Sequence, residues 1–272
     1  MKRALAPTLK YASLIIAAVL VLLPLSVVLF ASLKTSEEYS NTGPLTPPEN
    51  WFNISNFVTA FEKADMLQGF INTTIVLAIS LTGTILIGTM AAYAVDRFEF
   101  RGRKLIMGLF LVATLIPSVT SQVATFQIIN GLGLYNTKAA LVLLFMGTDI
   151  IAIYIFIQFM QSIPVSLDEA ALLDGANRWT IYWRIILPLL KPAIATVVII
   201  KGIAIYNEFY LPFLYLQSEP LISTALFRFK GPFGAQWELI AAATIVVIIP
   251  TVIAFMFLQK WIYKGLVAGA VK

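Results

Sequence analysis

The sequence predicts an all-α integral membrane protein with six transmembrane helices, and three observations support this fold class. First, 59% of the 272 residues are hydrophobic and only 12% are charged, about half the ~25% charged residues of a soluble domain. Second, the chain holds six apolar segments of the roughly 20 residues that a helix needs to cross a bilayer. Third, basic residues gather in alternate connecting segments. We therefore expect residues 1–272 to form one transmembrane domain.

The six apolar segments follow one another along the whole chain. The first comes after basic residues, as a signal peptide does. Its apolar run of 23 residues exceeds the roughly 7–15 of a signal peptide, so we expect it to remain as an anchor. The predicted spans are Tyr11–Leu33, Phe70–Val95, Leu105–Ile129, Ala139–Gln161, Pro192–Leu216 and Leu239–Gln259.

The distribution of basic residues predicts which side of the membrane each connecting segment faces. Thirteen lysines and arginines fall in the terminal and connecting segments on one side, and five fall on the other. Because cytoplasmic segments are enriched in Lys and Arg, the first side is assigned to the cytoplasm. Six spans place both termini on the same side, so the span count and the charges agree on two cytoplasmic termini.

The composition also excludes several kinds of chemistry. The chain has no Cys and no His. It therefore cannot form disulfides or thiolate metal sites, and it lacks the usual general base of enzymes. No G-x-x-x-x-G-K-[ST] phosphate-binding loop occurs in it. We therefore expect no enzyme, no metal site and no cofactor bound by this chain. If its function is driven by ATP, another chain must bind ATP and Mg²⁺.

The longest segment predicted on the outer side is Lys34–Gly69. Its first half contains Gly43, Pro44 and two further prolines, which favour turns and extended chain. The apolar residues of Ile54–Leu67 recur at helical spacing, so we expect a short helix lying at the outer surface there.

The most informative connecting segment is Ser162–Lys191, between the fourth and fifth spans, on the cytoplasmic side. Ser166 followed by Glu169 has the spacing of a capping box, which predicts that a short helix begins with Ser166 as its N-cap. Gly175 suits the position just beyond the end of this helix, where left-handed backbone is common.

A second short helix is expected after that turn. It would run from Asn177 or Arg178 to Ile186. Pro188 and Pro192 disfavour its smooth continuation into the fifth span, because proline lacks an amide hydrogen and clashes with the preceding turn.

The first of these two helices carries small apolar side chains at Ala170 and Ala171. Small residues allow another surface to approach the backbone closely, which suits docking into a cleft of a cytoplasmic partner. An amphipathic helix that rests on the lipid headgroups would have a similar composition. The physical pattern alone leaves both interpretations open.

One motif in this segment resembles a known family. Glu169-Ala170-Ala171, then Gly175, Ile185 and Leu187-Pro188, match the EAA pattern of the permease subunits of bacterial ABC importers. Three further stretches look like the carbohydrate branch of that family, in particular the smaller permease of the maltose type. These stretches are Phe70–Thr73, Tyr206–Phe209 and Gly265–Lys272.

The resemblance implies an ABC importer permease fold in a bacterial cytoplasmic membrane and a set of partner chains. These partners would be a second, different permease, two ATPase subunits that bind ATP and Mg²⁺, and an extracellular solute-binding protein, with no role for nucleic acid. The helix around the motif would couple this chain to an ATPase. The coupling residues implied are Glu169, Ala170, Ala171, Asp174, Gly175 and Lys272.

Charged residues inside the predicted spans need a partner or a wet cavity, because burying a charge in the bilayer is costly. Asp149 of the fourth span and Lys201 of the fifth lie at similar depths from the cytoplasmic side, so we predict a structural ion pair between them. A proton or substrate site is the functional alternative.

A second polar region lies toward the outer end of the fifth span, at Tyr206, Asn207, Glu208 and Tyr210. Aromatic faces beside hydrogen-bonding groups suit sugars, so these residues are candidates for the wall of a sugar pathway. An aromatic belt near the outer interface, packed against a partner permease, explains them equally.

Three functional hypotheses follow from these observations. The first is the permease subunit of an ABC importer for a carbohydrate, with an oligosaccharide as the favoured substrate. It accounts for the span pattern, the missing phosphate loop and the EAA motif together. A stand-alone secondary transporter or channel is the alternative, but it would lead us to expect more acids within the spans or an inverted repeat. A membrane enzyme fits least well, because His and Cys are absent.

Overall fold

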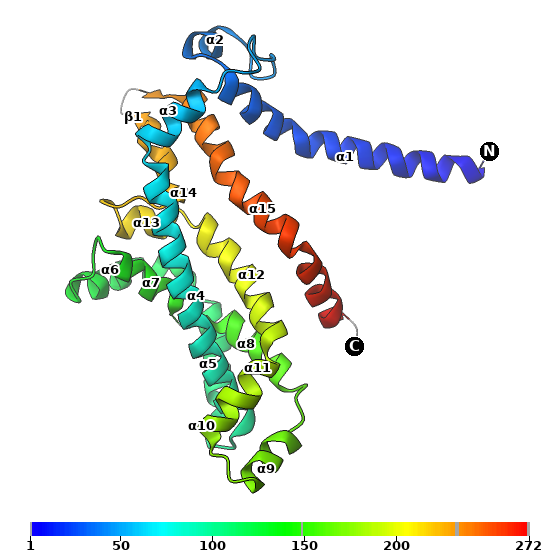
Figure 1. Cartoon of the computed structure of the whole chain (residues 1–272), viewed down its shortest axis with the longest axis vertical. Coiled ribbons are helices and arrows are strands. Elements are labelled where there is room, and N and C mark those ends of the chain that lie inside the picture. Colours follow the sequence, from blue (N-terminus) through cyan, green and yellow to red (C-terminus); the bar gives the residue numbers. More distant parts are fainter. Residues whose placement is uncertain (1, 148, 232–233, 271–272) are drawn as a thin grey trace. The chain divides into compact units, whose positions relative to one another are not determined.

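The structure is a computed structural model that describes residues 2–147, 149–231 and 234–270. Within these residues the regular structure is almost entirely helical (Figure 1). The α-helices are α1 (Lys2–Leu33), α2 (Ser36–Asn41), α3 (Ser55–Lys63), α4 (Met66–Arg97), α5 (Arg103–Thr114), α6 (Gln122–Gly131), α7 (Lys138–Met146), α8 (Ile150–Met160), α9 (Ser166–Leu173), α10 (Arg178–Ile181), α11 (Leu187–Leu189), α12 (Lys191–Asn207), α13 (Tyr210–Tyr215), α14 (Ile222–Ala225) and α15 (Trp237–Ala270).

Shorter elements complete the fold. The 3₁₀ turns are η1 (Ser118–Ser121) and η3 (Leu226–Phe229), and η2 (Tyr182–Ile186) is a π-helix. Strands β1 (Lys230–Gly231) and β2 (Gly234–Ala235) pair antiparallel, with Lys230 opposite Ala235. The chain divides into two compact units, one formed by Met1–Gly69 with Thr224–Ile253 and the other by Phe70–Ser223 with Ala254–Lys272.

In the first unit, a network of hydrogen bonds organises the turn that follows α1. The buried Lys34 ammonium donates to Thr42 Oγ1 at 2.8 Å and to the Gly43 carbonyl at 3.0 Å. The buried Asn56 amide donates to the carbonyls of Ser32 and Lys34 at 2.9 and 2.7 Å. The segment between α1 and α3 is therefore ordered, although its sequence is rich in turn residues.

Helix α3 confirms the short helix predicted within Ile54–Leu67 but is shorter than expected. It ends at Lys63, and Asp65 adopts a positive φ of 51° before α4 begins at Met66. The expected continuation to Leu67 is wrong because the chain turns here and Met66 already belongs to the next helix.

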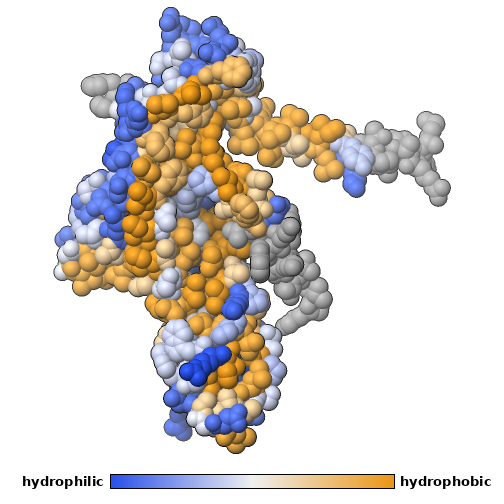
Figure 2. Space-filling view, in the orientation of Figure 1, coloured by the Kyte–Doolittle hydropathy of each residue, from blue (hydrophilic) through white to orange (hydrophobic). Residues whose placement is uncertain are grey.

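Helix α1 is long, apolar and exposed in the first unit. Leu20 and Val21 each expose 66% of their surface, and Figure 2 shows a hydrophobic surface along most of the coloured part of this helix, with hydrophilic residues next to its grey end. Such a surface suits lipid or another apolar surface rather than water.

The core of the second unit consists of two clusters. One surrounds Phe156 of α8 and reaches α4, α9, η2 and α12, and the other surrounds Leu141 of α7 and Tyr215 of α13. Gly88 permits the close packing of α4 on α8, because a Cβ at this position would lie 2.9 Å from the Phe156 ring.

The described residues contain three straight helices that are long and apolar enough to cross a membrane. These helices lie within Lys10–Leu33, Met66–Arg97 and Trp237–Phe257. Three further pairs of helices reach the required length only when both members of the pair are taken together, with bends of 93°, 43° and 68°. By length and composition the chain therefore has three to six candidate spans.

The predicted third span, Leu105–Ile129, is not one continuous helix. Helix α5 ends at Thr114, and the chain turns by 93° before it continues toward α6. Pro117 explains the break: it has extended backbone (φ −60°, ψ 128°) and no amide hydrogen, and it disfavours helical backbone in the residue before it.

The fourth and fifth predicted spans are also divided. The fourth bends by 43° between α7 and α8, and the fifth ends as a regular helix at Asn207, where Glu208 becomes extended before α13. The predicted discontinuity before the fifth span is confirmed: Leu190 separates the segment Arg178–Leu189 from α12 with a bend of 68°.

Candidate functional site

The segment with the EAA motif forms α9, which lies with α10 at one end of the second unit (Figure 1). The predicted capping box is wrong. The N-cap residue is Val165, and no side chain caps the helix. Pro164 and Val165 begin the turn earlier, since their carbonyls accept the amides of Leu167 and Asp168 at 3.2 and 2.9 Å. Ser166 is therefore already helical and cannot serve as the N-cap.

The predicted turn at the end of α9 is confirmed. Gly175 has a φ of +85°. Its amide donates to the Leu172 carbonyl at 3.0 Å, and the Ala176 amide donates to the Ala171 carbonyl at 2.9 Å. These two bonds define a Schellman motif, which ends a helix with one left-handed residue.

Helix α9 has one buried face and one exposed face. Asp168 and Ala171 are its buried residues. Glu169, Ala170 and Leu173 lie on the opposite side, and Leu173 exposes 90% of its surface.

This arrangement changes the predicted set of docking residues. Asp174 and Gly175 are exposed at the end of the helix, as a docking role requires. Ala171 packs into the core of the second unit instead, because α9 uses its smallest side chain to approach that core. The expectation that Ala171 faces a partner is therefore wrong. Lys272 lies outside the described residues.

The chain after Gly175 returns to the body of the second unit. Helix α10 begins after Asn177, whose side chain accepts the Thr180 amide at 2.8 Å. The predicted second helix then continues to Ile186 as the π-helix η2. The hydroxyls of Tyr182 and Thr89 are 2.8 Å apart, and Thr89 also donates to the Ile85 carbonyl at 2.6 Å, so Tyr182 is the donor to Thr89.

Tyr182 is buried at the point where η2 meets α4. Because the residue is only 2% exposed, the bond to Thr89 satisfies a hydroxyl that water does not reach.

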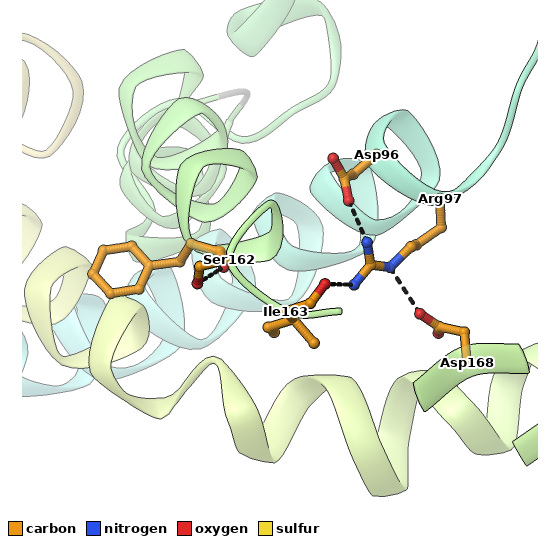
Figure 3. Close-up of polar contacts among 6 residues, drawn as sticks. Asp96, Arg97, Ser162, Ile163 and Asp168 are labelled. Carbon is orange, nitrogen blue, oxygen red and sulfur yellow. Dashed lines mark hydrogen bonds and ion pairs between the residues drawn. The ribbon is translucent and has the colours of Figure 1, made fainter. Parts of the chain in front are cut away.

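Sequence reasoning missed the ion-pair network beside α9 (Figure 3). The Arg97 guanidinium lies 2.8 Å from Asp96 and 2.8 Å from Asp168, and it donates to the Ile163 carbonyl at 2.7 Å. The contact of Arg97 Nε with Asp168 Oδ2 is an ion pair whose alignment is not that of a hydrogen bond. In the sequence, Arg97 is one of several basic residues in a connecting segment, and no local pattern links it to Asp168.

The structure brings together the two charges that were predicted to pair inside the membrane. Lys201 Nζ of α12 lies 2.7 Å from Asp149 Oδ2. Asp149 also caps α8, since its side chain accepts the Ala152 amide at 3.0 Å. Both residues line a cavity of about 150 Å³, which is otherwise formed by apolar side chains of α8 and α12.

The pair can be tested by a double-mutant cycle. We expect Asp149→Asn to destabilise the chain more than the combination of Asp149→Asn with Lys201→Met, because the single change leaves a lysine without its counter-ion. Asparagine still caps a helix, so this variant removes the charge alone. Thermal unfolding in detergent should give a coupling of roughly 0.5–3 kcal/mol. Additive effects would show that the two charges do not depend on each other.

The residues proposed from sequence for a sugar pathway lie at the junction of α12 and α13. The Glu208 carboxylate accepts the amides of Tyr210 and Leu211 at 2.9 and 3.2 Å, and the Asn207 side chain donates to the Ile203 carbonyl at 2.9 Å. Glu208 thus organises the first turn of α13. Asn207 and Tyr210 are exposed, whereas Tyr206 is partly buried.

A helical chain with several apolar spans, which presents a short exposed helix on a loop between two of them, has the architecture of a membrane transport subunit. Residues 84–267 match the family described as binding-protein-dependent transport system inner membrane component, and the chain belongs to this family. It is therefore an inner-membrane permease subunit of an ABC importer and not an enzyme.

Several related proteins cover nearly the full chain. The melibiose/raffinose/stachyose import permease protein MelC of Bacillus subtilis is 33% identical over 92% of this chain and 91% of its own length. The probable starch degradation products transport system permease protein AmyC of Thermoanaerobacterium thermosulfurigenes is 32% identical over the same shares. The arabinooligosaccharides transport system permease protein AraQ of Halalkalibacterium halodurans is 28% identical over the whole of both chains.

A solved structure has the same fold. A chain of a bacterial ABC transporter involved in the import of the acidic polysaccharide alginate superposes with a TM-score of 0.81, over 96% of this chain and 97% of that one. The two sequences are 20% identical. The similarity therefore concerns the fold, and it extends over nearly the whole chain.

Proposed function

We propose that this permease imports a carbohydrate of the oligosaccharide class. The proposal is supported by the substrates in the names of its relatives, which are melibiose, raffinose and stachyose for one and arabinooligosaccharides for another. The exposed polar and aromatic groups of Asn207 and Tyr210 offer hydrogen bonds and ring faces of the kind that sugars use. We assign Tyr206, Asn207, Glu208 and Tyr210 to the wall of the pathway.

The exposed face of α9 is the observation that carries the proposed assembly. A short helix that presents Glu169, Ala170 and Leu173, and that is closed by the exposed turn at Gly175, suits the cleft of an ATPase subunit. The complete importer in this proposal contains this chain, a second and different permease, two ATPase subunits and an extracellular solute-binding protein. ATP and Mg²⁺ are bound by the ATPase subunits.

The proposed topology has six spans and two cytoplasmic termini. Each bent pair of helices counts as one span, because a break in the helix is tolerated at membrane depth where protein buries it or it lines a cavity. The excess of basic residues on one side places α9 in the cytoplasm. This is the side on which an ATPase meets ATP.

Transport in this proposal proceeds by alternating access. A loaded binding protein docks on the outer side, and closure of the ATPase pair on ATP displaces α9. The spans then rock around a central cavity, of which this chain forms one wall. The chain carries out no covalent chemistry.

Purification from native membranes tests the proposal. We expect a mild-detergent pull-down of this chain to recover a second permease and an ATPase, with two ATPase copies for each permease pair by mass spectrometry. Recovery of this chain alone, under conditions that keep other ABC importers intact, would contradict the proposed assembly. It would favour a transporter or channel that acts by itself.

A further inference from the structure

The attachment of α9 to the rest of the second unit depends on very few side chains. Of its eight residues, Asp168 and Ala171 are buried and the others are at least partly exposed. Ala171 contributes one methyl group to the core. A contact this small allows the helix to tilt or roll unless something else determines its direction, so the Asp168 carboxylate is the side chain that can fix it.

In the described part of the chain, Asp168 forms an ion pair with one cation, Arg97, which also contacts two other points of the chain. Arg97 is the last residue of α4. Its guanidinium reaches Asp96 on α4 itself, the Ile163 carbonyl in the turn before α9 and the Asp168 carboxylate in the first turn of α9 (Figure 3). The side chains of Arg97 and Asp168 are only 3% and 1% exposed. One planar group therefore joins α4 to both the approach and the start of α9.

The choice of arginine is informative because of its geometry. The guanidinium carries five donors in a rigid plane, whereas a lysine ammonium is a flexible point charge. Buried ion pairs add little stability compared with apolar side chains of similar volume. This arrangement fixes the direction of the guanidinium instead, because its hydrogen bonds to Asp96 and to the Ile163 carbonyl set its plane. The ion pair then holds the Asp168 carboxylate beside Nε at 2.8 Å.

The chain on the other side of α9 is also attached to α4. Tyr182 bonds to Thr89 and packs against Tyr93 with ring centroids 5.6 Å apart, and the Arg178 guanidinium lies 5.4 Å from the Phe98 ring. Both ends of the α9 segment are therefore tied to the same end of α4. With α10 and η2 held in this way, the orientation of α9 itself rests on Arg97.

We propose that Arg97 is a positioning residue that joins α9 and the end of α4 into one rigid body. This inference rests on the proposed docking of α9 on an ATPase. A displacement of α9 by the ATPase then moves α4 directly, instead of being absorbed by bending of the loop. Arg97 acts through Asp168 and Ile163 and touches neither the ATPase nor the substrate.

The distance between α4 and α9 is the quantity that tests this proposal. The native chain has no cysteine, so a spin label attaches only where a cysteine is introduced. Two exposed positions are suitable, Ile79→Cys on α4 and Leu167→Cys on α9. Ile79 lies about 27 Å along the helix from Arg97 at 1.5 Å per residue. We expect one narrow distance distribution in the purified complex, with the same maximum without nucleotide and after trapping with ATP and vanadate.

Substitutions of Arg97 and Asp168 should widen this distance distribution. Arg97→Met should broaden the distribution and make its maximum depend on the nucleotide state, and Arg97→Lys should give an intermediate width. The double variant Arg97→Met with Asp168→Leu removes both charges and should restore the thermal stability but not the narrow distribution. Lys138→Met breaks an ion pair of 2.6 Å with Glu219 elsewhere in the same unit and should change neither.

Three results would overturn the inference: a maximum that shifts with nucleotide in the native background, a distribution that Arg97→Met leaves unchanged, or a narrow distribution in the double variant. If no ATPase co-purifies, the proposed function fails. In that case the proposed role of Arg97 can still be tested by itself. The width of the distance distribution without nucleotide is compared between the native background and Arg97→Met.

Discussion

Replacing Gly175 by leucine should abolish the coupling of transport to ATP while leaving the chain inserted in the membrane. Gly175 has a φ of +85°, a region in which a residue with a Cβ is disfavoured by roughly 1–2 kcal/mol. Such a difference changes the population of the Schellman turn by a factor of roughly 5–30. Because this turn holds the exposed end of α9, we expect stimulation of ATP hydrolysis by the binding protein to fall about tenfold or more in reconstituted vesicles.

The chain provides a matched control for this change. A Cβ at Gly175 or at Gly108 would meet no atom within 4 Å, but Gly108 lies inside α5 with ordinary helical backbone. Gly108→Leu should therefore leave the stimulation intact. Gly175→Asn should fall between the native protein and the leucine variant, because asparagine tolerates left-handed backbone. Normal stimulation in Gly175→Leu would show that the turn has no role in coupling.

A second large effect is expected when Leu173 is replaced by glutamate. Leu173 exposes 90% of its surface at the end of α9, where an apolar side chain gains stability only when a partner covers it. If it fills a pocket of the ATPase, its loss should remove about 2 kcal/mol or more of binding free energy. This corresponds to roughly 30-fold in affinity, measurable by titrating the purified ATPase onto the permease pair in nanodiscs.

Leu167 serves as the control for Leu173. It is also exposed on α9, at 42%, but it lies about a third of a turn away from the face of Glu169, Ala170 and Leu173. Leu167→Glu should bind the ATPase almost normally. Equal losses from both variants would indicate that α9 senses charge in general and does not dock through one face.

The helical class with apolar spans and the position of the short helix that carries the EAA motif could be predicted from the sequence, because they depend on composition and local order. An apolar run of about 20 residues is sufficient to indicate a span. The turn at Gly175 was predictable for the same reason, since one glycine after a short helical pattern specifies left-handed backbone locally. The pairing of Asp149 with Lys201 followed from the rule that charges inside the bilayer need a partner.

Other features could not be read from these patterns in the sequence. The start of α9 differs from the capping-box prediction because Pro164 and Val165 begin the turn before Ser166. The motif does not tell which face of α9 turns inward, and only the packing of Ala171 into the core decides it. The bend after α5 depends on how the chain continues beyond Pro117, which an apolar run cannot specify.

The sequence by itself therefore determined what kind of protein this is, which segments are apolar enough to cross a membrane, and which glycine ends α9. The tertiary structure decided how that helix is held. Arg97 lies at the end of α4 and Asp168 lies on α9, and neither charge stands out in the sequence. Only the fold buries them together at 2.8 Å, because a long-range ion pair has no local pattern from which it could be read.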